Sequence, residues 1–166
     1  MKLVVDSCCL ISWNRSAFFE KVIDSGLFQL QIGYFVLDEL RKETWLSSLI
    51  NNGQINVIDL SISLEEVETF SKVKKLGSGE SEAILIAKTA LINFCSDDNR
   101  ARKIATAIVG KNKVIGTLGI MKSLNEQGFI NKTDLYLYYQ NMKTTGSFLP
   151  DYSEINFNAF LLSNSL

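Results

Sequence analysis

The sequence predicts a single α/β domain with a central, mainly parallel sheet flanked by helices. Two observations support this fold class. Short runs rich in β-branched residues alternate along the chain with longer segments of helical period, and turn signals rich in glycine and asparagine separate them. The chain has 166 residues, 46% of them hydrophobic, which is enough for one well-buried core and short for two.

The expected strands are short apolar runs. Lys2 to Asp6 (KLVVD) is typical of a buried strand, and Ile55 to Leu60 follows the turn signal Asn51-Asn52-Gly53. The full set of extended runs covers residues 2–6, 28–32, 55–60, 92–95 and 113–115.

The expected helices lie between these strands. The first ends before Gly26, and Gly77-Ser78-Gly79 separates the third from the fourth. Their ranges are 13–24, 34–50, 64–75, 81–91, 98–109 and 117–127. After Gly128 the pattern is helical over 135–142, and Pro150 begins a last segment through Phe160. We therefore expect one domain over residues 1–166, with a core of about 1–130 and a helical C-terminal extension of about 131–166.

Composition limits the chemistry. The chain has no histidine, so proton transfer must use carboxylates, lysine, tyrosine, thiols or metal-bound water. The three cysteines include an adjacent pair in apolar surroundings, which argues against a disulfide framework and for a reducing cytoplasm. The first residues resemble neither a secretory signal nor a membrane span, so we expect a soluble protein with no membrane partner.

Acidic residues stand where apolar elements end. Asp6 ends the first strand, and Asp97 and Asp98 follow the strand at 92–95. In open parallel sheets, ligands bind outside the carboxyl ends of the strands, so these acids fall on the binding edge. A turn or helix N-cap is the alternative role for such residues, and for Asp97 we favour the N-cap.

Helical geometry selects two further acids. On a wheel of the helix at 81–91, Glu80 lies with the apolar stripe and Glu82 lies opposite. On the helix at 34–50, Glu39 lies among apolar residues, with Glu43 one turn on as an auxiliary acid and Lys42 as a structural ion-pair partner. A bound divalent cation explains such carboxylates, because Mg²⁺ and Mn²⁺ take oxygen ligands. For Glu80, the alternative is a favourable interaction with the helix dipole.

Several segments together resemble the PIN-domain ribonuclease family, close to VapC-type toxins. They are LVVDSCCLI, FVLDEL, LGSGESEAILIAKTA, FCSDDNRARKIA and VIGTLGIMKSLNEQGFI, and they span about residues 1 to 130 in the family's order. The resemblance implies a three-layer PIN-like fold with an acidic pocket for Mg²⁺ or Mn²⁺.

The resemblance also implies roles for individual residues. The four catalytic acids are Asp6, Glu39, Glu80 and Asp98, and the supporting hydroxyls are Ser7 and Ser96. We expect Asp6, Glu80 and Asp98 to bind the metal ion, and we add the neighbouring Asp97 as a further metal ligand. Many relatives have aspartate where this chain has Glu80. We assign Thr117, in the segment GTLGIM, to a strand-to-helix turn rather than to catalysis.

We therefore expect a metal-dependent endoribonuclease that leaves 5′-phosphate and 3′-hydroxyl ends. The lack of histidine weighs against a mechanism through the ribose 2′-hydroxyl. The net charge of −1 argues against strong nonspecific binding of nucleic acid, but Arg100, Arg102 and Lys103 lie beside Asp98 and are candidates for holding the RNA backbone. A solvated helix face explains these cations equally well.

Two other classes stay open. One is a noncatalytic PIN-fold binding or scaffold protein. The other is a metal-dependent phosphohydrolase for small phosphate esters, although its D-x-D motif would need a second aspartate where this chain has Cys8. If the protein is a toxin, the resemblance implies a homodimer and an antitoxin that covers the acidic pocket.

Overall fold

One parallel sheet forms the centre of the molecule. The computed structural model describes residues 1–59 and 62–163, and the sheet in this part has the strand order β3-β2-β1-β4-β5 with every pairing parallel. The strands are β1 (Lys2–Val5), β2 (Gln29–Ile32), β3 (Ile55–Val57), β4 (Asn93–Cys95) and β5 (Val114–Ile115). This confirms the predicted fold class.

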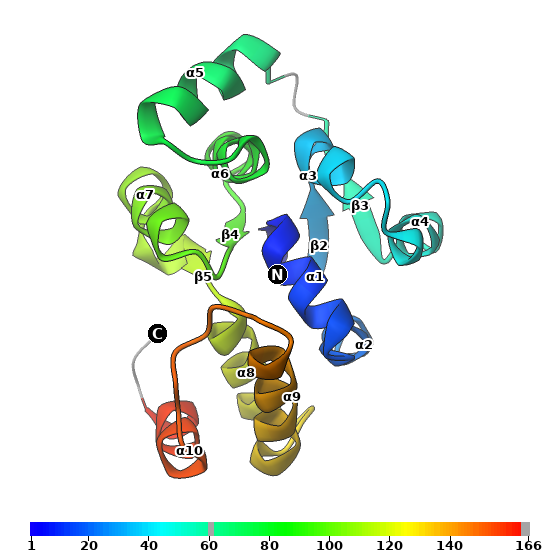
Figure 1. The fold of residues 1–166 in the computed structure, drawn as a ribbon, viewed down its shortest axis with the longest axis vertical. Helices are drawn as coiled ribbons and strands as arrows, with labels where there is room; N and C mark the ends of the chain where they lie inside the picture. The colour runs from blue at the N-terminus through cyan, green and yellow to red at the C-terminus, as the bar shows by residue number, and fades with distance from the viewer. Residues whose placement is uncertain (60–61, 164–166) are drawn as a thin grey trace.

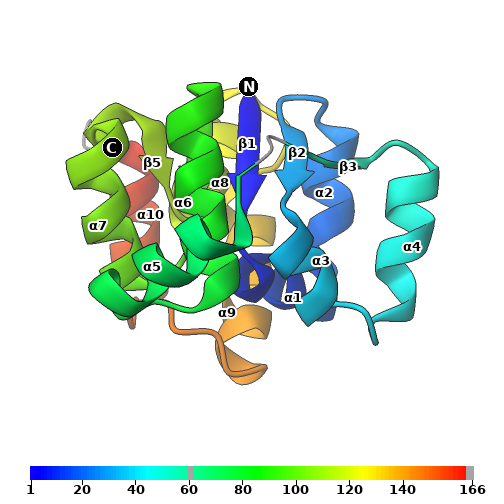
Figure 2. The same cartoon turned by 90° about the horizontal axis from the view of Figure 1, so that it is seen from above.

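Helices cover both faces of the sheet. Figure 1 shows α5, α6 and α7 on one side and α8, α9 and α10 on the other, and Figure 2 shows α6 and α7 lying in front of the strands. The helices are α1 (Ser7–Arg15), α2 (Phe18–Asp24), α3 (Tyr34–Glu39), α4 (Thr44–Asn51), α5 (Leu64–Lys74), α6 (Ser78–Ala90), α7 (Asn99–Val109), α8 (Thr117–Glu126), α9 (Lys132–Thr144) and α10 (Glu154–Leu162), with a 3₁₀ turn η1 (Lys111–Lys113) before β5.

Alternation along the strands divides the core in two. Leu3 and Val5 of β1 face the larger cluster, which contains α1, α2, α8, α9 and α10, while Val4 faces a second cluster with α6 and α7. All three side chains are fully buried, as expected for the central strand of a sheet that is covered on both faces.

Two long predicted helices are each broken. The helix expected at 13–24 is α1 and α2: α1 begins directly after β1 because Asp6 caps it, and Ala17, with a φ of 58°, separates it from α2. The helix expected at 34–50 is α3 and α4, with the chain leaving helical geometry between Leu40 and Glu43. The prediction of one continuous helix over residues 34–50, and the helical wheel drawn from it, were therefore wrong.

Other boundaries differ by a few residues. Helix α6 begins at Ser78, so Glu80 lies inside its first turn, and the residues before Val114 form η1 rather than strand. The strand expected at 55–60 is β3, and its predicted end at Leu60 lies outside the described residues.

The wheel of α6 also misplaced one acid. Glu82, predicted to lie opposite the apolar stripe, has an exposed fraction of only 6%, and its neighbour Ser81 is fully buried. Helix α6 packs against α3, α5, α7, β1 and β4, so it has no single solvent face in its first half.

The three cysteines are free thiols, with Cys8 exposed and Cys9 and Cys95 buried. Among the described helices, none has the length and apolar character needed to cross a membrane.

Candidate metal-binding and active site

The acids gather at the carboxyl edge of the sheet, between β1 and β4. In the sheet, β2 and β3 lie on one side of β1, and β4 and β5 lie on its other side. The strand order therefore reverses between β1 and β4. Val5 pairs with Cys95, and the Asp6 N–H donates to the Cys95 carbonyl at 3.1 Å. Asp6 and Ser96, the next residues on the two strands, therefore lie side by side.

Asp6 is almost fully buried, with an exposed fraction of 1%. Its Oδ1 accepts the Cys9 N–H at 2.8 Å, which caps α1, whereas its Oδ2 is buried and has no hydrogen-bond partner among the described residues. Burial raises the pKa of Asp6 to about 7; the Ser96 side chain and the Cys9 N–H oppose this rise and the Asp97 carboxylate adds to it. A buried, unpaired carboxylate oxygen at a sheet edge indicates a ligand site.

Glu39 ends α3 and reaches the start of α6. Its Oε1 accepts the Gly79 N–H at 3.2 Å, and its Oε2 accepts the Ser7 hydroxyl at 2.6 Å. A β-carbon on Gly79 would lie 2.6 Å from the Glu39 carboxylate, so a larger residue there would displace the Glu39 side chain. Glu39 itself is exposed, so its predicted place on an inward apolar face was wrong, but it points into the acidic edge. Its carboxylate partners are Ser7 and Gly79 rather than Lys42.

Glu80 lies in the first turn of α6. Its Oε2 accepts the Gly77 N–H at 3.0 Å, so it caps its own helix, which is the structural role weighed for it from the sequence. Glu39 bonds both Ser7, the neighbour of Asp6, and Gly79, the neighbour of Glu80, so it links the segments that carry these two acids. The pKa of the Cys8 thiol is raised to about 11 by partial burial and by the charges of Asp6, Glu80 and Glu39. Cys8 was not anticipated here as part of the site.

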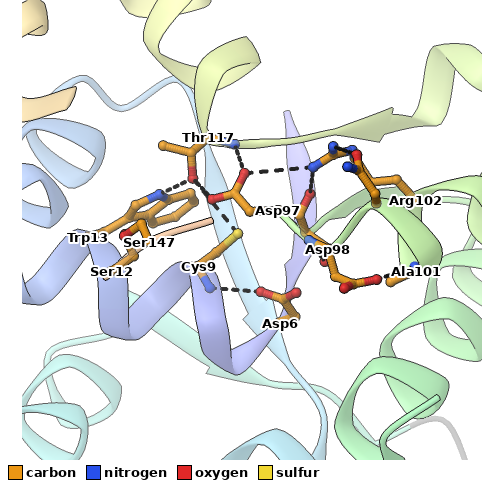
Figure 3. A network of polar contacts seen from close by, with 12 residues as sticks. Asp6, Cys9, Ser12, Trp13, Asp97, Asp98, Ala101, Arg102, Thr117 and Ser147 are labelled. Carbon is orange, nitrogen blue, oxygen red and sulfur yellow. Dashed lines mark hydrogen bonds and ion pairs between the residues drawn. The ribbon is translucent and has the colours of Figure 1, made fainter. Parts of the chain in front are cut away.

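Asp97 does not cap α7 as we expected. Its Oδ1 accepts the Thr117 N–H at 2.8 Å and its Oδ2 accepts the Thr117 hydroxyl at 2.5 Å, which caps α8 instead (Figure 3). Arg102 lies 3.9 Å from Oδ1, and the Asp97 side chain is only 11% exposed. Asp97 is thus a fixed, nearly buried charge.

Asp98 is the N-cap of α7, with Oδ1 accepting the Ala101 N–H at 2.7 Å. It is exposed, unlike Asp6 and Asp97. Ser96 is buried, and its hydroxyl accepts the Asp98 N–H at 3.1 Å. Ser96 therefore shapes the turn that carries both aspartates.

The predicted basic residues lie on the first turns of α7. Arg100 donates to the Lys74 carbonyl at 2.9 Å, and Arg102 donates to the Ser96 carbonyl at 2.9 Å and to Asn99. Lys103 is exposed. Both arginines thus help to hold the loop between β4 and α7 and the end of α5.

Glu82 is a structural residue that sequence reasoning missed. Its carboxylate accepts the Tyr34 and Phe35 N–H groups at 3.0 and 2.8 Å, at the start of α3. Since Glu39 at the other end of α3 accepts from α6, the two helices exchange carboxylate contacts. Burial raises the pKa of Glu82 despite these hydrogen bonds. Glu43 instead accepts the Trp45 indole N–H at 2.7 Å and has no place in the site.

The carboxylate oxygens at this edge are the kind of ligand that a hard divalent cation prefers, although the acids are not yet close enough together to bind one. In the part of the chain that the structure describes, no three acidic or thiol side chains form a group that could hold a metal ion as they stand. The chemistry fits Mg²⁺ or Mn²⁺, because the acids supply only oxygen and Asp6 Oδ2 lacks a partner.

The fold and the acidic edge together define a three-layer α/β domain with carboxylates at its topological switch point. The chain belongs to the PIN-domain family: the model of the family DUF3368, a PIN domain, matches residues 2–154. This is a nuclease fold.

Among solved structures, the crystal structure of PAE2754 from Pyrobaculum aerophilum is similar at 15% identity, with a TM-score of 0.48 over 84% of this chain and 96% of that chain. No curated protein matches the sequence.

Proposed function

We propose that the protein is a metal-dependent endoribonuclease that hydrolyses phosphodiester bonds. The observation that carries this proposal is Asp6, a buried carboxylate with an unpaired oxygen at the strand-order switch point, next to Ser7, whose hydroxyl binds Glu39. Membership of the PIN-domain family supports it, because PIN domains are generally metal-dependent nucleases.

We assign Asp6, Glu80, Asp97 and Asp98 to holding Mg²⁺ or Mn²⁺, and Glu39 to completing the catalytic set. A divalent cation bound there supplies an activated water and neutralises charge on the phosphodiester. The Ser7 hydroxyl and the Gly79 N–H hold Glu39 in place. With no histidine in the chain, proton transfer falls to these carboxylates and to water.

A groove of about 700 Å³ offers a path for the RNA strand. It passes from Asp97 and Arg102 along the edge strand β5, and Lys111 and Lys113 also line it. Its apolar wall includes Phe148, whose side chain is 95% exposed. Cations hold the backbone and an exposed aromatic ring stacks bases, which is the usual pairing in single-strand binding sites.

The test is cleavage of 5′-labelled single-stranded RNA by the purified protein with Mn²⁺ and with EDTA. We expect Mn²⁺-dependent cleavage that leaves 3′-hydroxyl ends. Asp6→Asn should abolish cleavage, while Asp24→Asn, which changes an exposed acid at the end of α2, should leave it intact. Cleavage that survives in Asp6→Asn would contradict the site assignment, and a cyclic phosphate end would contradict the mechanism.

One observation favours a noncatalytic role. At least one oxygen of each predicted acid accepts a hydrogen bond from a backbone N–H. A structural function alone would therefore explain where the acids lie. Calorimetry with Mn²⁺ separates the two roles, because a scaffold protein would bind no Mn²⁺ and cleave no RNA.

The resemblance to VapC-type proteins supports extending the proposal to a toxin that forms a homodimer and is inhibited by an antitoxin. Expression in bacteria tests this role. A toxin arrests growth, Asp6→Asn relieves the arrest, and a small protein encoded beside it restores growth to the wild type.

A further inference from the structure

Thr117 joins three elements that are far apart in the sequence. It is the first residue of α8 and is fully buried. Its hydroxyl contacts the Trp13 indole nitrogen of α1 at 2.7 Å and Asp97 Oδ2 of the loop after β4 at 2.5 Å, while its N–H contacts Asp97 Oδ1 at 2.8 Å (Figure 3).

The chemistry of the groups fixes the direction of these hydrogen bonds. The Trp13 indole can only donate and the Asp97 carboxylate can only accept, whereas the Thr117 hydroxyl has one hydrogen and can do both. The hydroxyl therefore accepts from Trp13 and donates to Asp97. The Cys9 sulfur, at 3.8 Å, is the weaker acceptor for that hydrogen.

Thr117 consequently fixes the plane of the Asp97 carboxylate, because it binds both oxygens. Gly116 leaves the space for this arrangement: a β-carbon there would lie 2.9 Å from Asp97 Oδ1. Arg102 lies 3.9 Å from Oδ1. The carboxylate is thus held in one orientation at the switch point, one residue beyond Ser96, which lies beside the buried Asp6 across β1 and β4.

We propose that Thr117 is a positioning residue for the metal site, and that it orients Asp97 so that Asp97 and Asp6 present oxygens to the same divalent cation. This inference rests on the proposed function. Residues that hydrogen-bond to metal ligands fix the orientation of those ligands, and their loss typically lowers metal affinity by about 10- to 100-fold.

The test is the Mn²⁺ dissociation constant, measured by calorimetry on the full chain. Thr117→Val keeps the shape of the side chain and removes the hydroxyl, so we expect it to weaken Mn²⁺ binding by about 10- to 100-fold. Thr117→Ser keeps the hydroxyl, so its Mn²⁺ dissociation constant should stay close to that of the wild type.

Trp13→Phe is the matched control for packing. It removes the indole N–H but leaves the Thr117 hydroxyl able to donate to Asp97, so the protein should lose stability and keep its Mn²⁺ affinity. If Trp13→Phe weakens Mn²⁺ binding as much as Thr117→Val, the effect is one of packing and the inference is wrong. It is also wrong if Thr117→Val loses stability but binds Mn²⁺ like the wild type.

Urea unfolding first establishes that each variant is folded. If Thr117→Val is unfolded, Gly116→Ala asks the same question with the hydroxyl intact, because its β-carbon crowds Asp97 Oδ1 and should weaken Mn²⁺ binding. Unchanged binding in that variant overturns the inference. A wild-type protein that binds no Mn²⁺ overturns the proposed function itself, which distinguishes the two failures.

Discussion

Replacing Asp6 with asparagine should stabilise the metal-free protein at neutral and alkaline pH. Burial raises the pKa of Asp6 from 3.8 to about 7, so the ionised form of this side chain opposes folding. A difference of about three pKa units corresponds to roughly 4 kcal/mol. The substituted asparagine would keep an oxygen to accept the Cys9 N–H and would carry no charge.

The effect has a definite pH dependence. Because the pKa of Asp6 is higher in the folded state, the folded protein binds more protons and its stability falls as pH rises. Below the unfolded pKa of 3.8 the penalty is absent; it grows as pH rises and is complete above about pH 7. The free energy of unfolding of Asp6→Asn should therefore exceed that of the wild type by about 4 kcal/mol more at pH 8 than at pH 4.

Urea unfolding in the presence of a chelator, followed by tryptophan fluorescence, measures this difference. Its pH dependence is the informative quantity, because any cost of burying the amide is the same at every pH. Asp24→Asn is the control and should follow the wild type throughout. A difference between Asp6→Asn and the wild type that stays constant from pH 4 to pH 8 would refute the reasoning.

Mn²⁺ should remove most of this difference at pH 8. At 100 times its dissociation constant, a ligand that binds only the folded state adds about 3 kcal/mol of stability. The wild type should gain this amount and Asp6→Asn should gain little.

Three further predictions test neighbouring parts of the structure. Gly33→Ala should destabilise the protein by about 1–3 kcal/mol in urea unfolding, because its β-carbon would clash with the Glu82 carboxylate that holds the start of α3; an unchanged midpoint would contradict this. Lys111→Glu should raise KM for RNA several-fold without changing Mn²⁺ affinity, whereas Lys88→Glu on α6 should change neither; equal effects of the two variants would exclude the groove as the RNA path. Lys122→Met should speed hydrogen exchange in α10 by about 10- to 100-fold, because the buried Lys122 amine donates to the Ser163 carbonyl just after that helix; uniform exchange across the chain would show a global effect instead.

The sheet was predictable because its signals are local. β-Branched runs mark the strands, and their alternation with helical segments implies parallel pairing. The breaks in the helices were not predictable in this way. Residues 40–43 (LRKE) contain neither glycine nor proline, and the non-glycine residue Ala17 takes a left-handed conformation. At the break after α3, contacts from a distant element contribute, because Glu82 and Gly79 of α6 hold the two ends of α3.

The acids were predictable only where a rule of topology applied. Asp6, Asp97 and Asp98 follow strands, and parallel strands bring their carboxyl ends to one edge. The helical wheel failed for Glu82 because it assumes a single apolar face, whereas α6 is enclosed by several elements. The partnership between Asp97 and Thr117 joins positions 20 residues apart and has no periodic signal.

Helix N-termini explain how so many carboxylates gather at one edge. The acids accept N–H groups from the first turns of four helices: Asp6 from α1, Glu39 and Glu80 from α6, Asp98 from α7 and Asp97 from α8. Each such position stabilises a negative charge by about 0.3–1 kcal/mol. Two carboxylates about 4 Å apart repel by roughly 4 kcal/mol at an effective dielectric constant of about 20, so the helices together offset about one close pair.

The protein itself thus supplies hydrogen-bond partners to these carboxylates. Asp6 is the exception, because its second oxygen is buried without a partner among the described residues and its own N-cap does not compensate for burial. A cation that binds this oxygen recovers free energy that folding alone has lost. Metal affinity should consequently depend most on Asp6. The same side chain that lowers the stability of the metal-free protein should thus contribute most to binding the cation.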